Sequence, residues 1–247
     1  TMLLLMLALV SPLFACRIIL PPPWPPYPPR PPVPPQPPAL QAMEVREHRA
    51  EVRVRGQIAQ VAIEATFFNP NNRRIAGTYY FPIDPQAAVS SFSMTVGGKT
   101  LEAQLLPAEE ARKTYEDIVR KEQDPAILEY IDHGMLKARV FPIEPKSEVK
   151  IHLSYEQQAR EDGGLVRFRY PLLSTRPGGG NPVAKLVLDF QVESQTPLTT
   201  LYTPGFDSRI ERPDDHRASV RFEAANYRPE QDFELVYGTA AGVAGAN

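Results

Sequence analysis

Apolar and polar residues alternate along most of the chain from residue 45 onward, which is the period of a β-strand with one buried face. Val52 and Val54 alternate with charged neighbours, and the alternation resumes over residues 59–67. Gly56-Gln57 lies between the two runs and can turn the chain. The pattern therefore predicts a half-buried hairpin with its turn at Gly56-Gln57.

A second tight hairpin is predicted at Gly97-Gly98, which separates alternating runs at residues 91–96 and 101–105. Asn69-Pro70-Asn71-Asn72 is a cluster of turn-forming residues. Further strands are expected near residues 127–131, 137–141, 149–155, 166–170, 184–192, 220–222 and 233–237.

One segment departs from the period of two. Over residues 107–121 the apolar positions recur at helical spacing, with acids in the first turn and bases in the last. Pro107 suits a helix start, and Asp124-Pro125 ends the pattern. The chain is therefore predicted to be mainly β, an antiparallel β-sandwich with one inserted amphipathic helix.

Two similar strings each follow a strand-like run: Phe81-Pro82-Ile83-Asp84-Pro85 and Phe141-Pro142-Ile143-Glu144-Pro145. In each, the first proline lacks an N–H group and is expected to end the ladder. The acid before the second proline is expected to open a turn. Phe81 and Phe141 are predicted to be buried anchors at the strand ends.

The first sixteen residues are predicted to be a signal peptide. The apolar run at residues 3–10 is too short to span a bilayer and has the length of a signal-peptide core. Leu13-Phe14-Ala15-Cys16 resembles the lipobox of bacterial lipoproteins, although Phe14 departs from its usual small or β-branched residue. The resemblance implies lipid attachment to Cys16. Cleavage of an ordinary secretion signal near Ala15 and an uncleaved anchor are the alternatives.

Residues 17–42 are predicted to be a disordered, Pro-rich stalk. The chain has 28 prolines, and they are concentrated at residues 21–38, which can form neither a helix nor the interior of a sheet. Polyproline II geometry, at about 3.1 Å per residue, would give this stretch a reach of roughly 55 Å. A spacer that holds a domain off a membrane is expected; a ligand for aromatic-lined grooves is the alternative.

Composition excludes several classes of function. The formal net charge is −2, so there is no electrostatic case for nucleic-acid binding. The single cysteine, Cys16, can form no intrachain disulfide and excludes a two-cysteine metal motif. No hydrolase elbow, phosphate loop or His-Glu-x-x-His pattern occurs.

The four histidines each have an interpretation that needs no catalysis. His48 is interpreted as a decoration of a charged strand edge and His152 as part of a solvated strand face, while His133 and His216 are assigned to turns. No nucleophile and base share a recognisable spacing. We therefore expect no enzyme, no cofactor and no metal site.

Two binding surfaces are conceivable. Arg167, Arg169 and Arg176 could form a basic patch, but alternation makes the first two a solvated strand face. A carbohydrate site needs clustered exposed aromatic residues. The candidates for it are Tyr79, Tyr80, Tyr130, Tyr202 and Tyr227.

Residues 43–158 resemble a VIT domain, the vault protein inter-alpha-trypsin module. The resemblance rests on the order and spacing of several strings. They are the early strand pair, Asn69-Pro70, Tyr80-Phe81-Pro82, Phe92-Ser93-Met94 with Gly97-Gly98-Lys99, Glu109-Glu110-Ala111-Arg112-Lys113-Thr114-Tyr115-Glu116, Val140-Phe141-Pro142-Ile143 and Ile151-His152-Leu153-Ser154-Tyr155.

Alternation continues beyond the resemblance and gives the expected layout of the rest of the chain. Residues 159–237 are expected to be an additional β-strand region and residues 238–247 a linker-like tail. In proteins of this type a von Willebrand A domain follows, yet no Asp-x-Ser-x-Ser metal motif occurs here, so either such a domain lies beyond Asn247 or this protein lacks it.

The expected function is a noncatalytic interaction or scaffold module, anchored in the bacterial cell envelope through lipidated Cys16, with a protein partner that the sequence does not identify. A secreted β-sandwich enzyme or carbohydrate-binding module is the alternative.

Overall fold

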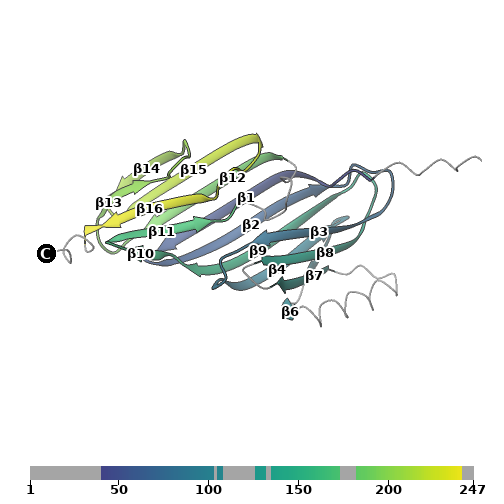
Figure 1. The fold of residues 1–247 in the computed structure, drawn as a ribbon, viewed down its shortest axis with the longest axis horizontal. Helices are drawn as coiled ribbons and strands as arrows, with labels where there is room; N and C mark the ends of the chain where they lie inside the picture. Colours follow the sequence, from purple (N-terminus) through teal and green to yellow (C-terminus); the bar gives the residue numbers. More distant parts are fainter. Residues whose placement is uncertain (1–39, 103–104, 108–125, 132–134, 173–181, 241–247) are drawn as a thin grey trace, which may run out of the picture. The chain divides into compact units, whose positions relative to one another are not determined.

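The computed structural model describes residues 40–102, 105–107, 126–131, 135–172 and 182–240, and these residues form three β-sheets (Figure 1). The large sheet has eight strands in the order β14 (Arg209–Asp214), β15 (Arg217–Tyr227), β12 (Val183–Glu193), β1 (Glu44–Arg55), β2 (Ile58–Phe68), β9 (Glu148–Gln158), β4 (Ala88–Val96) and β5 (Lys99–Glu102).

Two smaller sheets have four strands each. The β11 sheet has the order β10 (Arg160–Asp162), β11 (Leu165–Tyr170), β16 (Phe233–Thr239) and β13 (Leu198–Tyr202). The β8 sheet has the order β3 (Ile75–Pro82), β8 (Met135–Ile143), β7 (Ala126–Ile131) and β6 (Leu105–Pro107). The prediction of a mainly β fold is confirmed.

Both tight hairpins form where glycine was expected to turn the chain. β1 and β2 pair up to Arg55 and Ile58, and Gly56 between them has a φ of 58°. β4 and β5 pair up to Val96 and Lys99 around Gly97-Gly98, whose φ values of 55° and 80° suit a two-residue hairpin loop. Positive φ at these positions explains why the sequence has glycine there.

The large sheet has one apolar face and one polar face, because the inward positions of neighbouring strands are in register. Ala50 on β1 pairs with Ile63 on β2, which pairs with Leu153 on β9, and all three are buried. The inward apolar residues of the three central strands and β12 are Ala50, Val52, Val54, Ala59, Val61, Ile63, Ala65, Phe67, Val149, Ile151, Leu153, Tyr155, Leu186, Leu188, Phe190 and Val192.

Both small sheets contact this apolar face through aromatic rings. Phe81 on β3 lies with its ring centroid 6.3 Å from that of Phe92 on β4. Phe190 on β12 lies between Phe168 and Phe233 of the β11 sheet, with ring centroids 6.0 and 4.7 Å away. The fold is therefore a β-sandwich in which two small sheets share one side of the large sheet.

Pairing in the large sheet is antiparallel except between β1 and β12. These two strands form a parallel ladder from Val45 and Val183 to Arg55 and Glu193. Among the described residues a second parallel ladder joins β6 to β7. Parallel strands need a long connection, which more than a hundred residues between β1 and β12 supply.

The β1–β12 ladder joins two regions that the sequence separates. β1, β2, β4 and β9 come from the predicted VIT segment, 43–158, while β12, β14 and β15 come from the predicted additional region, 159–237. The two regions thus contribute to the same sheet. The boundary between them stays a prediction.

The two Phe-Pro-Ile strings differ in how they end their strands. Pro82 is the last residue of β3, as expected, and Phe81 and Ile83 are buried. Pro142 lies inside β8, at the irregular pairing between Ile75–Gly77 and residues 140–143, so the expected end of that ladder is wrong. A bulge leaves a backbone position unpaired, and a proline fits there because it has no N–H to pair.

Several expectations concern residues outside the described ranges. They are the leader at 1–16, the stalk at 17–42 apart from its last three residues, the buried side chain of Phe141 and the tail beyond residue 240. Of the helix predicted for residues 107–121, only Pro107 is described, at the end of β6. Within the described ranges, no helix has both the length and the apolar character that crossing a bilayer requires.

Candidate functional site

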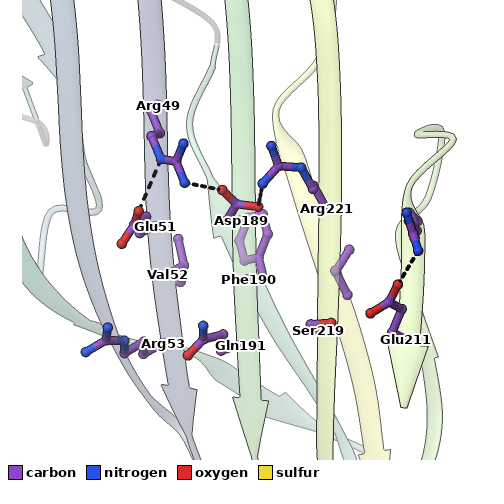
Figure 2. Close-up of a pocket in the computed structure, with 12 residues that line it drawn as sticks. Arg49, Glu51, Val52, Arg53, Asp189, Phe190, Gln191, Glu211, Ser219 and Arg221 are labelled. Atoms are coloured by element: carbon purple, nitrogen blue, oxygen red, sulfur yellow. Dashed lines mark hydrogen bonds and ion pairs between the residues drawn. The ribbon is translucent and has the colours of Figure 1, made fainter. Parts of the chain in front are cut away.

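Two grooves lie on the polar face of the large sheet. The first has a volume of about 410 Å³ and lies over β1, β12, β15 and β14 (Figure 2). Its lining is mostly charged or polar: Arg49, Glu51, Arg53, Asp189, Gln191, Arg209, Glu211, Ser219 and Arg221, with Val52, Phe190 and Val220 also contributing. Strand alternation explains this composition, because residues between the core positions of each strand point to the opposite face.

Asp189 is the centre of an ion-pair ladder across three strands. Its two carboxylate oxygens accept hydrogen bonds from Arg49 on β1, at 3.0 Å, and from Arg221 on β15, at 2.6 Å (Figure 2). The Asp189 side chain is 22% exposed, whereas both arginines are more open. Charge-assisted bonds to both oxygens favour this arrangement of the three side chains.

Other ion pairs extend the ladder over the same face. Arg49 also contacts Glu51 at 3.1 Å, and Arg221 also contacts Glu223. Arg55 pairs with Glu193 at 2.9 Å, and Lys185 with Glu47 at the same distance. Exposed pairs contribute little stability, about 0–1 kcal/mol each. Their main effect here is to set a pattern of charges on a rigid sheet.

The second groove, of about 500 Å³, lies beside the first on the same face. It is lined by Glu47, Arg49, Glu51, Glu64, Ala65, Thr66, Ser93, Thr95, Lys150, Ile151 and His152. Arg49 and Glu51 contribute to both grooves, so charged and hydroxyl side chains from β1, β2, β4, β9, β12, β14 and β15 form one continuous polar surface.

His152 lies in this second groove and contacts a hydroxyl group. Its Nε2 is 3.1 Å from Oγ of Ser154, two residues along β9. Sequence spacing had indicated no such nucleophile and base, although i and i+2 positions of a strand always share a face. Among the described residues no acid contacts the other ring nitrogen, so the arrangement lacks the third group that orients a catalytic base.

His48 is in the core, so its interpretation as a strand-edge decoration is wrong. It is 9% exposed, and its Nε2 lies 2.7 Å from the hydroxyl of Tyr170 on β11. β1 is a central strand between β12 and β2, and His48 is in phase with buried Ala50 and Val52. The alternation that buries Ala50 and Val52 is the sequence pattern that indicates burial of His48. Burial lowers the pKa of His48 to about 4.

The other predicted residues do not assemble into a site. His216 lies in its expected turn, where Nδ1 donates to the carbonyl of Ser194 at 3.0 Å. His133, Arg176 and Cys16 lie outside the described residues. Within the described ranges, no cluster of three or more His, Cys, Asp or Glu side chains could hold a metal ion.

Arg167 and Arg169, considered above for a basic patch, are paired charges on a strand face. Arg167 lies 3.5 Å from Glu234, and Arg169 pairs with Asp232, in both cases between β11 and β16 or its flank. Both arginines are exposed, as alternation along β11 indicated.

The tyrosines proposed for a carbohydrate platform are dispersed. Tyr79 packs in the core, with its ring centroid 4.3 Å from those of both Phe67 and Phe81. Tyr202 lies on β13 and Tyr227 at the end of β15, packed on Phe222. Tyr79, Tyr202 and Tyr227 therefore provide no shared aromatic surface.

Comparison with known proteins supports the resemblance seen in the sequence. The family model described as the vault protein inter-alpha-trypsin (VIT) domain matches residues 45–155. These limits agree with the segment 43–158 identified from the sequence motifs.

Two curated relatives each match less than half of the chain. The human protein mono-ADP-ribosyltransferase PARP4 is 28% identical over 109 residues, which are 42% of this chain and 6% of that protein. The mouse von Willebrand factor A domain-containing protein 5A is 27% identical over 119 residues, 47% of this chain and 15% of that protein. The chain thus spans only a small part of the length of both relatives.

A solved structure shares the fold over a longer stretch. It is the crystal structure of a Legionella pneumophila protein that carries the provisional description of a nutrient-binding protein. The TM-score is 0.56 at 15% identity, and the match covers 84% of this chain and 70% of that chain. At this identity the likeness concerns the fold alone.

Proposed function

We propose that this chain, which carries a VIT domain at residues 45–155, is a noncatalytic protein-interaction module held at the bacterial cell envelope by a lipid on Cys16. The observation that carries the proposal is the polar face of the large sheet. It is wide and charged, and ion pairs such as Arg49 with Asp189 arrange its charges across neighbouring strands. A defined arrangement of charges on a sheet favours specific recognition, because complementary potentials select the partner.

The chemistry of the described side chains supports an interaction role over catalysis. Ser154 and His152 are half-exposed on an open strand face, and the contact between them lacks an orienting acid. His48 is buried and bonded to Tyr170. The matching VIT family model and the mouse relative named for its von Willebrand A domain are consistent with recognition by contact.

Anchoring at the envelope rests on the first 42 residues. The apolar run, Leu13-Phe14-Ala15-Cys16 and the proline stretch follow one another in the order that an exported lipoprotein with a spacer would need. One acyl chain binds a membrane only marginally, so stable attachment at Cys16 would require more than one.

A von Willebrand A domain is proposed for the complete protein. The mouse relative carries this domain in its name, and this chain matches only 15% of its length. A metal-dependent partner site would then belong to that domain, while the polar face of the VIT region would supply a second contact surface.

Two measurements test the proposal. Mass spectrometry of the mature N-terminus after expression in bacteria should find acylated Cys16, and Cys16→Ser should move the chain from the membrane to the soluble fraction. An unmodified Cys16, or cleavage elsewhere, contradicts the anchoring.

The interaction role is tested by cross-linking on envelope preparations. A double variant, Glu64→Lys with Lys150→Glu, reverses charges on the polar face without changing the net charge. It should abolish the cross-linked products of the wild type. The matched control is the charge-conserving swap Arg167→Glu with Glu234→Arg on the β11 sheet, which should retain them. Equal loss in both, or a hydrolytic or glycan-binding activity that disappears with His152→Ala, would favour the enzyme or carbohydrate-binding alternative.

A further inference from the structure

One row of side chains on the polar face has no ion pair within it. Backbone register places Arg53 on β1 opposite Gln191 on β12, and Gln191 opposite Ser219 on β15. The three side chains therefore lie next to one another across adjacent strands, which are about 4.8 Å apart. All three line the first groove.

In the rows on either side, the charged side chains form ion pairs with one another. On one side Glu51, Asp189 and Arg221 belong to the ion-pair ladder, and on the other Arg55 pairs with Glu193 at 2.9 Å. Within the part of the chain that the structure describes, the side chains of Arg53, Gln191 and Ser219 make no hydrogen bond or ion pair. Figure 2 shows Arg53 and Gln191 side by side below the Asp189 ladder, without a dashed line to either.

These three side chains are a set of donors. The Arg53 guanidinium offers a planar fork of N–H groups, Gln191 an amide NH₂ and Ser219 a hydroxyl. A guanidinium fork matches the two oxygens of a carboxylate, and the amide and hydroxyl can donate to whichever oxygen positions remain. The row therefore suits a small anion that approaches from the solvent side.

The charges of the groove indicate a single negative charge on the ligand. Four arginines and three acids line it, which leaves an excess of one positive charge. A carboxylate balances that excess, whereas a phosphate dianion would be repelled by Glu51, Asp189 and Glu211. Phe190 lies beneath the groove and is 1% exposed, so it offers no open ring for a sugar to stack on.

The C-terminal carboxylate of a ligand fits this row of donors less well than the carboxylate of an Asp or Glu side chain does. Terminal carboxylates are captured in nests of free backbone N–H groups. Here β12 is hydrogen-bonded on both sides, to β1 and to β15, so its backbone groups are used in the sheet. Side-chain donors alone are left for the ligand.

We propose that Arg53, Gln191 and Ser219 form a recognition site for an Asp or Glu side chain on the surface of a protein partner. The proposal rests on the interaction role proposed above and names the group on the partner that is recognised, a carboxylate side chain. An exposed guanidinium with no internal partner is then the group from which the partner's acid gains its bidentate contact.

The test is an NMR titration of the whole chain with three short peptides. The first is acetylated and amidated Gly-Gly-Asp-Gly-Gly, the second has Asn in place of Asp, and the third is acetylated pentaglycine with a free C-terminal carboxylate. The Nε–Hε signal of Arg53, identified by its loss in Arg53→Gln, should shift with the Asp peptide and not with the other two. Raising the salt from about 0.05 to 0.5 M should weaken this binding, because the groove is open to solvent.

Variants locate the contact. Followed through the backbone amide signals of Gln191 and Ser219, which both proteins have, Arg53→Gln should weaken Asp-peptide binding about tenfold, equivalent to about 1.4 kcal/mol. Arg53→Lys keeps the charge but loses the fork and should weaken it less. Arg167→Gln, on the β11 sheet, is the control and should bind as the wild type does. Equal shifts with the Asn peptide, a stronger response to the C-terminal carboxylate, or unchanged binding by Arg53→Gln would each overturn the assignment.

Failure of the Arg53 site can be distinguished from failure of the proposed interaction role. If the cross-linked partner is kept by Arg53→Gln and the Asp peptide leaves Arg53 unchanged, the site assignment is wrong and the interaction role stands. If the Asp peptide binds Arg53 but no partner is captured by the wild type, a protein is not the occupant and both proposals fall.

Discussion

The hydroxyl of Tyr170 lies 2.7 Å from Nε2 of His48, and this contact connects the β11 sheet to the middle of the large sheet. Both side chains are buried. The pair is a polar contact inside an apolar interface, so the ring of His48 must stay neutral for the interface to remain intact. Burial accordingly lowers the pKa of His48 to about 4.

Stability should therefore fall as the pH falls from about 6.5 to 4. The unfolded chain takes up the His48 proton near its ordinary pKa of 6.5, whereas the folded chain does so only near 4. Over this window about 3 kcal/mol of unfolding free energy should be lost. Denaturant titrations of the wild type and His48→Gln at several pH values isolate this contribution, since carboxylates and exposed histidines are common to both. A stability gap between them that does not change with pH would contradict it.

Two buried tyrosines should respond oppositely to loss of the hydroxyl. Tyr170→Phe leaves Nε2 of His48 without its partner and should cost about 1–3 kcal/mol of unfolding free energy. The Tyr155 hydroxyl is buried and has no hydrogen-bond partner within the described structure. Tyr155→Phe should therefore be neutral or stabilising by up to about 1 kcal/mol. Thermal melts of the two variants side by side make the comparison, and a larger loss in Tyr155→Phe would show a missed partner.

Asn69 should be among the polar residues on which stability depends most. It is completely buried, and its Nδ2 donates to the carbonyls of Arg73, Ile143 and Glu144 at 2.9–3.2 Å. Asn69→Ala leaves these acceptors unpaired and should cost about 3 kcal/mol. The exposed neighbour Asn72 is the matched control, because Asn72→Ala should change stability by no more than about 0.5 kcal/mol. Equal denaturation midpoints for the two variants would contradict the role of Asn69.

Phe81 should behave as a buried anchor and His152 as a surface residue. Phe81 is 1% exposed and packs on Tyr79, with ring centroids 4.3 Å apart. Phe81→Ala should cost about 3–5 kcal/mol. His152→Ala should cost about 0.5 kcal/mol or less. Melts of both variants decide this, and Phe141→Ala tests whether the second Phe-Pro-Ile string has an anchor of the same kind. A more damaging His152→Ala would contradict the assignment.

Alkaline pH should unfold the chain through its buried tyrosines. Burial raises the pKa of Tyr79 and Tyr237 to about 12, and it also raises the pKa of Tyr155 and Tyr170. Because the unfolded chain releases these protons near pH 10, the stability that the neutral rings contribute is present below pH 10 and is lost as the pH rises toward 12. Tyrosinate absorbance should therefore appear together with the loss of β-sheet circular dichroism. Ionisation of these tyrosines without unfolding would contradict it.

Strand positions and turns were accessible from sequence because they are local. Val52 and Val54, the glycines at 56 and 97–98, and the alternation over residues 149–155 each specify a face or a turn without reference to the rest of the chain. The strand pairing is not local. Alternation states which residues of β1 and β12 point inward, but it does not state that the two strands are neighbours or that they run parallel.

The polar groove could not be predicted from the sequence for the same reason, because it depends on which strands are neighbours. Arg53 and Gln191 look like ordinary solvated positions of two separate strands, and only their register brings them together with Ser219. His48 was a different kind of miss. Its charged neighbours favoured an exposed position, but His48 lies at the same inward positions of the β1 alternation as Ala50 and Val52.

The parallel ladder between β1 and β12 also determines where this chain can be divided. Without the residues that follow 158, β1 would be a twelve-residue edge strand with its backbone N–H and C=O groups open to another molecule. An isolated fragment ending there would be prone to edge-to-edge aggregation or to strand exchange between copies. Closing the ladder brings together residues that are far apart in sequence, which raises the contact order and slows folding. Newly synthesised chains would thus expose the edge of β1 until β12 emerges and pairs with it.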